Sequence, residues 1–216
     1  MAARKKDAEL LTRERIVEAA MRVIDADGVD ALSMRRLGTE LGVNPMAAYH
    51  YVPNKAALYD LVLDAVMSEV DLSTIASTGP LEERLKQAGR AYRNAIMAHP
   101  RAIPVLAGRS VRSAIGMRPV EAFLGLLFEA GLTSGDAISA VDCVAQFVLG
   151  GAVGYYHHVE DTEIGQQRDF DELTPEEFPN MARVLAEAEF AGHDCEFEYG
   201  LDALVRGILS GPRAGS

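Results

Sequence analysis

Apolar residues recur at helical spacing along most of the chain, and this spacing constrains the fold more than any other feature of the sequence. After Thr12, for example, Ile16, Ala19, Ala20 and Val23 fall on one face of a helix. Alternating apolar and polar residues, which would indicate strands, are scarce, and no internal repeat is found. We therefore predict an all-α fold.

Capping residues divide the first part of the chain into short helices. Side chains of serine, threonine and asparagine accept hydrogen bonds from the free N–H groups at a helix start, and glycine commonly ends a helix. The predicted starts are Thr12, Ser33, Asn44 and Asn54, and the predicted ends are Gly28 and Gly42. Pro45, directly after Asn44, fits the first position of a helix.

Longer helices are predicted after a linker of serine, threonine and glycine at 73–79. They begin at Pro80, before Val120, at Ser134, at Thr174-Pro175-Glu176-Glu177 and near 194, which gives about ten helices in all. The helix at 134–157 is apolar on nearly all sides, so we expect it to be buried. Cys143 in this helix is expected to be a buried apolar side chain.

The net charge of −11 at first argues against a nucleic-acid partner, but its distribution along the chain softens that argument. Residues 1–60 have no net charge, so the whole excess of acid lies in residues 61–216. A relatively basic N-terminal segment beside an acidic body suits a protein that places one end on phosphates. By itself this asymmetry is weak support.

No targeting or membrane segment is predicted. The basic N-terminus has no apolar run behind it, as a signal peptide would have. The longest uncharged stretch, 143–159, contains three glycines and two histidines, and it falls short of the roughly 18–20 apolar residues that a membrane span needs. Two cysteines do not make a disulfide framework. We therefore expect a soluble, cytoplasmic protein without a membrane partner.

The segment 31–55 contains two short helices separated by a turn with Gly42, which is the pattern of a DNA-reading helix-turn-helix. The first helix would brace the second, and Gly42 lets the backbone turn where a side chain would clash. The second helix, from Pro45 to about His50, keeps its N-terminal end exposed. Its outward side chains then fit a major groove about 12 Å wide.

Several runs of residues resemble the TetR family of bacterial repressors. In the N-terminal segment they are Gly28-Val29-Asp30-Ala31-Leu32-Ser33-Met34-Arg35-Arg36-Leu37, Leu41-Gly42-Val43, Tyr49-His50-Tyr51 and Asn54-Lys55-Ala56-Ala57-Leu58. Further along, His99-Pro100, Arg118-Pro119, the helix from Phe123 to Gly131 and Phe147-Val148-Leu149-Gly150 are similar to the tetracycline-repressor type of C-terminal domain.

The resemblance implies a division of the chain into two domains. Residues 1–55 would form a three-helix, helix-turn-helix DNA-binding domain, followed by a connecting helix to about residue 70. Residues 71–216 would form a helical domain for ligand binding and dimerisation.

The resemblance also assigns residues to DNA binding: Ser33, Met34, Arg35, Asn44, Pro45, Met46, Ala47, Tyr49, His50, Tyr51 and Lys55. It implies that Arg35 reaches a guanine edge and Asn44 an adenine, while Met46 and Ala47 meet a thymine methyl. Tyr49, Tyr51 and Lys55 match phosphate-contacting positions, and the N-terminus of the helix after Lys55 adds to the attraction.

Plainer interpretations remain open for several of these positions. Arg36 is equally well a solvated charge, Asn44 a helix cap and Met46 a core residue. The basic residues Arg4, Lys5 and Lys6 would be a minor-groove arm or a tail, and we favour the tail.

Members of the family hold a small molecule within the C-terminal helices, and its binding changes the separation of the DNA-reading heads. The candidate ligand-binding residues in this chain are Leu106, Arg109, Phe123, Leu127, Gln146, Phe147, Tyr155 and His157. Tetracycline repressors hold a magnesium–antibiotic complex with histidines and a glutamate, and the matching positions here are Leu106, Gln146 and Gly154. Phe123 stands where the family has a drug-contacting glutamine. A largely apolar, uncharged effector is therefore expected instead.

Dimerisation is expected through the helices at 134–157 and 194–209, whose second apolar faces need a cover. Gly150, Gly151 and Gly154 would permit close helix approach. A dimer of this kind presents two recognition helices about 34–36 Å apart to a palindromic double-stranded operator.

The sequence leaves two other classes of function as alternatives. A helical enzyme would use Cys143 or His157, but no nucleophile–base–orienter spacing supports it. An interaction protein with a vestigial DNA-binding head would bind DNA only weakly and without specificity. We expect no catalytic residue, no cofactor and no metal site, and repression rather than activation follows from the family alone.

Overall fold

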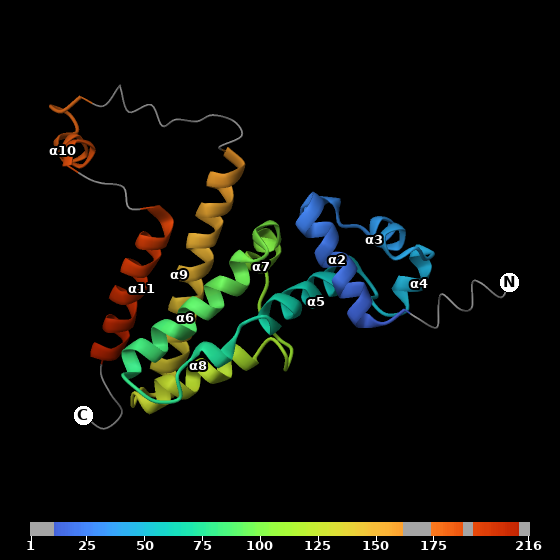
Figure 1. Ribbon diagram of the computed structural model, residues 1–216, viewed down its shortest axis with the longest axis horizontal. Coiled ribbons are helices and arrows are strands. Elements are labelled where there is room, and N and C mark those ends of the chain that lie inside the picture. The colour runs from blue at the N-terminus through green and yellow to red at the C-terminus, as the bar shows by residue number, and fades with distance from the viewer. Residues whose placement is uncertain (1–10, 162–173, 188–191, 212–216) are drawn as a thin grey trace.

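The computed structural model describes residues 11–161, 174–187 and 192–211, with only the backbone described at 157–161. These ranges contain ten α-helices and no strand, which confirms the all-α prediction. Their bounds are α2 Arg13–Asp27, α3 Met34–Leu41, α4 Pro45–Tyr49, α5 Lys55–Ser68, α6 Leu81–Met97, α7 Ile103–Ala107, α8 Arg118–Glu129, α9 Ser134–Asp161, α10 Pro179–Glu187 and α11 Gly192–Ser210. Figure 1 shows α2, α3 and α4 together at one end, which we call the head, and α6 to α11 at the other, which we call the body.

The predicted capping residues begin the first helices as expected. The side-chain oxygens of Thr12, Ser33, Asn44 and Asn54 each accept a hydrogen bond from a backbone N–H in the first turn of the helix that follows. Gly42 ends α3 in the left-handed conformation (φ 68°), which non-glycine residues rarely adopt. Local sequence chemistry therefore sets the helix boundaries in the head.

The head is held together by fully buried side chains from each of its helices, among them Ile16, Leu37 and Ala48. Helices α3 and α4 approach closely because Gly38 has no side chain. A Cβ atom added at Gly38 would lie 2.9 Å from Pro45 Cγ and 3.1 Å from Pro45 Cα. The angle between the bracing helix and the recognition helix thus depends on a glycine facing a proline.

Helix α5 joins the two parts of the molecule (Figure 1). It packs against α2 of the head and against α6 and α7 of the body. Leu58 and Val62 are completely buried, and so is Val66 one turn further along. A helix packed at both ends in this way fixes the head relative to the body.

The body is a set of packed helices in which α6 contacts α8, α9 and α11. Leu85, Leu127, Val148 and Leu201 are among its most buried side chains. Charged pairs reinforce the contact between α6 and α11.

Three cations on α6 bind carboxylates on α11: Lys86 with Asp202 (2.7 Å), Arg90 with Glu198 (2.8 Å) and Arg93 with Asp194 (2.6 Å). Hydrogen bonding from Arg90 holds the pKa of Glu198 below its ordinary value. These three ion pairs therefore hold α11 against α6 along the length of the contact.

The structure differs from the sequence-based expectation at three helices. Helix α7 was not predicted, because a helix of little more than one turn shows no clear periodicity in the sequence. The helix expected at Thr174 begins instead at Pro179, with Thr174 accepting turn hydrogen bonds from Glu177 and Phe178. Pro179 disfavours helical backbone at Phe178, so the segment from Thr174 does not form one continuous helix.

The third correction concerns α9, which is buried on one side only. Ile138 is 49% exposed, and Cys143, predicted to be buried, is exposed. Its Ser134–Tyr156 stretch has the length and mean hydropathy (1.6) of a membrane helix, but α6, α7, α8 and α11 pack against α9. Periodicity could not tell an uncovered apolar face from a buried one.

Replacing Gly38 with alanine should destabilise the head, because the new methyl group meets the backbone of Pro45. We expect Gly38→Ala to lower the free energy of unfolding by about 1–3 kcal/mol. Gly125→Ala is the matched control, since Gly125 is also helical but has open space around it, and it should gain up to about 1 kcal/mol. Chemical denaturation measures both, and equal effects would contradict the close approach of α3 and α4.

Candidate nucleic-acid interface and ligand cavity

Helix α4 presents a row of exposed side chains at the end of the head. Met46 is 65% exposed, Tyr49 41% and Tyr51 36%, and His50 is exposed between the two tyrosines. Exposed apolar and aromatic groups of this size are unusual on a surface without a partner. The exposure of Met46 excludes the alternative that it belongs to the core.

The two neighbouring arginines of α3 have different surroundings. Arg36 binds Asp27 at 3.1 Å and Glu40 at 3.2 Å, so it is a structural ion pair and not merely a solvated charge. The guanidinium of Arg35 is exposed, and among the described residues it has no hydrogen-bond or ion-pair partner. Arg35 is thus the one of the pair whose donors remain available for an anion or a base edge.

Several other predicted DNA-binding residues have structural roles in the unbound head. Ser33 and Asn44 cap α3 and α4, with Ser33 Oγ accepting from Arg36 N at 3.1 Å and Asn44 Oδ1 from Met46 N at 2.9 Å. Met34 is only 9% exposed and belongs to the head core. Pro45 packs on Gly38, and Ala47 is half-buried.

Lys55 lies at the first position of α5, directly after the capping residue Asn54. Its side chain is exposed, and Nζ lies 5.3 Å from the centre of the Tyr59 ring. The N-terminus of a helix attracts anions through its free N–H groups and its dipole. Lys55 therefore adds a charge where the backbone already favours phosphate.

A cavity of about 520 Å³ lies in the body and is lined by α5, α6, α7, α8, α9 and the loop after α7. Most of its wall is apolar. Of the predicted ligand-binding residues, Leu106, Arg109, Phe123 and Gln146 line it.

The structure places the other predicted ligand-binding residues elsewhere. Leu127 is fully buried in the core, Phe147 stacks on Phe197 with ring centres 5.5 Å apart, and Tyr155 lies edge-on to His193. Consecutive helical residues point about 100° apart, so Gln146 faces the cavity while Phe147 faces α11. The side chain of His157 lies outside the described part of the structure.

Sequence reasoning missed the contribution of α5 and α6 to this cavity. The wall includes Leu63, Val66, Met67 and Val70 from α5, and Ala88, Tyr92 and Ile96 from α6. A possible signal was that α5 carries apolar residues on more faces than packing against the head requires. The end of the connecting helix is therefore part of the cavity wall.

Few polar groups reach the cavity. Arg109 is held by Asp60, at 2.8 Å from Nε and 2.5 Å from Nη2. Burial raises the pKa of Tyr92 to about 12, so its hydroxyl is neutral at physiological pH, and no described residue hydrogen-bonds to it. Asp142 has no ion pair within the described ranges. The cavity suits a largely apolar molecule with few hydrogen-bonding groups.

The loop between α7 and α8 ties the cavity to the connecting helix. Arg109, at the start of this loop, binds Asp60 of α5, and Ser113 donates a hydrogen bond to Asp64 of α5 at 2.6 Å. Asp60 and Asp64 lie one helical turn apart, on the same face of α5. A change in the loop would therefore act directly on the helix that carries the head.

The two parts of the chain match two known domains. Residues 16–62 match the family described as bacterial regulatory proteins, tetR family. Residues 76–211 match the tetracyclin repressor-like, C-terminal domain.

Curated relatives align with most of the chain. The HTH-type transcriptional repressor DrrR1 of Streptomyces coeruleorubidus is 30% identical over 213 residues, which covers 92% of this chain and 77% of the relative. The tetracycline repressor protein class A from transposon 1721 of Escherichia coli is 28% identical over 210 residues, covering 93% and 95%.

A solved structure of similar fold is that of ActR from Streptomyces coelicolor in complex with actinorhodin. It superposes with a TM-score of 0.82 at 30% identity and covers 96% of this chain and 98% of ActR. ActR in complex with (S)-DNPA gives a TM-score of 0.81 at 31% identity, covering 94% and 98%.

The different burial of two methionines in the head predicts unequal effects of their replacement on stability. Met34→Ala should lower the free energy of unfolding by about 2 kcal/mol or more, because it opens a cavity in the head core. Met46→Ala, at an exposed site, should stay within about 0.5 kcal/mol of the wild type. Urea denaturation compares them, and an unchanged midpoint for Met34→Ala would show that this side chain is not part of the core.

Proposed function

The chain belongs to the tetR family of bacterial regulatory proteins, and from that premise we propose that it is a homodimeric repressor that binds a palindromic operator and is released by a small, largely apolar ligand. It is a DNA-binding transcriptional regulator and not an enzyme. We place its site of action in the cytoplasm, where DNA is accessible.

The observation that carries this proposal is the row of exposed side chains at the end of the head. Among the described residues, the side-chain donors of Arg35 have no partner, while Arg36 beside it binds Asp27 and Glu40. Met46, Tyr49 and Tyr51 are exposed next to it on α4 and just after it. An arginine, a lysine and aromatic hydroxyls around an exposed helix N-terminus are the groups that contact phosphates and base edges.

We propose the domain division at 1–55 and 71–216, with α5 connecting the two. The buried side chains of α2, α3 and α4 support a head with a core of its own. The contacts of α5 with α6 and α7 support a connecting helix that extends into the body.

We propose dimerisation through the uncovered faces of α9 and α11. On α9 Cys143 is exposed, and on α11 Tyr199 is 81% exposed. Gly150, Gly151 and Gly154 have open space around them, which lets a second helix approach closely. Apolar surface of this kind, next to small residues, is typical of helix pairing across a two-fold axis.

We propose that the effector occupies the cavity of about 520 Å³. ActR, which has a similar fold, has been solved in complex with actinorhodin, and this supports a small-molecule site in this chain. Leu106 and Gln146 line the cavity, and the resemblance matches both to positions where tetracycline repressors hold the metal complex. We therefore expect a largely apolar molecule and not a magnesium–tetracycline complex.

We propose that ligand binding reaches the head through the loop between α7 and α8. The pairs Arg109–Asp60 and Ser113–Asp64 join this loop to α5. A ligand that displaces the loop changes the position of α5, and the two recognition helices of the dimer then lose their common spacing.

Operator binding is tested by selecting duplexes from a random pool at about 0.15 M salt. We expect a palindrome, and we expect Arg35→Ala to weaken binding to it by about 1–3 kcal/mol. Arg36→Ala is the matched control and should keep most of the affinity, since Arg36 serves the fold. Electrophoretic shift measures both.

Two outcomes would contradict the proposal. One is the recovery of no sequence above nonspecific binding that falls steeply with salt. The other is equal loss of binding for Arg35→Ala and Arg36→Ala in folded protein.

Cavity occupancy is tested with Nile red, an uncharged apolar dye whose fluorescence rises in apolar surroundings. Val120 lines the cavity, so Val120→Trp should fill part of it and raise the dissociation constant for the dye about tenfold or more, equivalent to about 1.4 kcal/mol. Phe128→Trp on the same helix is the control, because Phe128 is 51% exposed and lies outside the cavity wall. Equal dye binding by both variants would place the dye elsewhere.

A further inference from the structure

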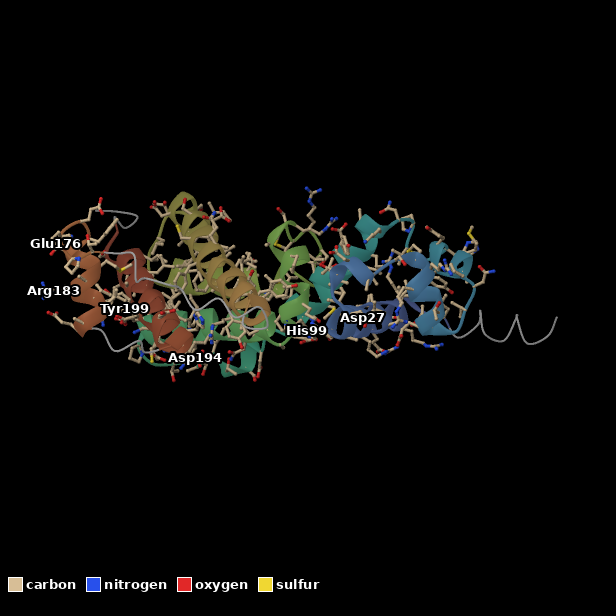
Figure 2. The ribbon with its side chains drawn as sticks, turned by 90° about the horizontal axis from the view of Figure 1, so that it is seen from above. Asp27, His99, Glu176, Arg183, Asp194 and Tyr199 are labelled. Atoms are coloured by element: carbon tan, nitrogen blue, oxygen red, sulfur yellow. The ribbon has the colours of Figure 1, made fainter. Side chains whose placement is uncertain are left out.

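His99 lies at the junction of head and body, between α6 and the short turn Pro100–Ala102. Figure 2 shows it beside the end of α2, where Asp27 is labelled. The side chain is only 15% exposed. Any motion of the head relative to the body would therefore change the surroundings of His99.

Both ring nitrogens of His99 face carboxylates. Nδ1 lies 3.1 Å from each oxygen of Asp25 on α2, and Nε2 lies 3.0 Å from Oε2 of Glu69 at the end of α5. A neutral imidazole has one N–H, so it can donate to only one of these carboxylates, while the other would face a lone pair. Only the protonated ring donates to both.

A second cation strengthens the same junction. The guanidinium of Arg101 donates hydrogen bonds to the backbone carbonyls of Asp25 and Ala26, in the last turn of α2. The C-terminal end of a helix carries partial negative charge, which favours cations at this place. We call His99, Arg101, Asp25 and Glu69 the His99 clamp.

The charged groups that bind in this cluster come from three of the elements that meet there. They are Asp25 from α2, Glu69 from the end of α5 and Arg101 from the turn after α6. Burial by itself would lower the pKa of His99, but the hydrogen bonds and charges of Asp25 and Glu69 outweigh it and raise the pKa above its ordinary value.

We propose that protonation of His99 locks the head onto the body in the arrangement that binds the operator, so that operator affinity falls as the clamp loses its proton. The inference rests on the proposed function, in which the unliganded arrangement is the one that binds DNA. Protons and operator then favour the same state, and each strengthens the binding of the other.

The sign follows from the raised pKa of His99. The stabilisation by the clamp is fully present below the ordinary histidine value of about 6.5 and is lost as the pH rises through the raised value. The transition therefore lies on the alkaline side of the ordinary histidine value.

The first arm of the test follows the imidazole of His99 by NMR in the full-length protein without DNA, with the signal assigned by its absence in His99→Gln. We expect His99 to titrate above the ordinary value. Asp25→Asn and Glu69→Gln should each bring it back toward that value. Titration of His99 at its ordinary value in the wild type would overturn the clamp, whatever the protein binds.

The second arm measures affinity for the selected duplex between about pH 6 and pH 8.5. We expect the wild type to lose about threefold more affinity over this range than His99→Gln, which is less than the tenfold that one pKa unit allows. His50→Gln is the control for protonation at the DNA surface, and it should keep the difference from His99→Gln. Parallel pH profiles for the wild type and His99→Gln would overturn the proposal.

The two arms also separate the inference from the function on which it rests. If the wild type selects no duplex at any pH, the proposed function fails. The coupling of the clamp to an operator fails with it, while a raised titration of His99 still establishes the protonated link between head and body.

Discussion

Helix α5 packs against both the head and the body, and the rest of the structure depends on these two sets of contacts. Leu58 and Val62 are buried near the head, while Leu63, Val66 and Met67 form part of the cavity wall. Interiors are close-packed, so a helix shared between two packed regions cannot shift against one without disturbing the other. The connection between a cavity and a distant surface is therefore built into the apolar pattern of a single helix.

Charge pairing decides which cations remain available for a partner. Arg36 is used within the head, Lys86, Arg90 and Arg93 join α6 to α11, and Arg109 holds a loop to α5. Exposed ion pairs contribute little stability each, but they fix the direction in which long side chains point. In the described head, this leaves Arg35 and Lys55 facing outward beside α4, on a chain whose net charge is strongly negative.

Local signals in the sequence succeeded where the physics is local. Thr12, Ser33, Asn44 and Asn54 all cap helices, because a capping bond involves residues only two or three positions apart. Predictions that needed the partner of a helix face fared less well. Cys143 is exposed, and Phe147 faces α11 while Gln146 faces the cavity, since a rotation of one residue along a helix changes its neighbour.

The sequence by itself determined the all-helical class, most helix ends and the helix-turn-helix segment, because helical spacing and capping depend on residues only a few positions apart. Only the tertiary structure decided which apolar residues surround the cavity and which of two adjacent arginines is paired with carboxylates inside the head. It alone brought His99 between Asp25 and Glu69, residues that lie 74 and 30 positions away. Contacts of that separation depend on how helices pack, and no local pattern encodes them.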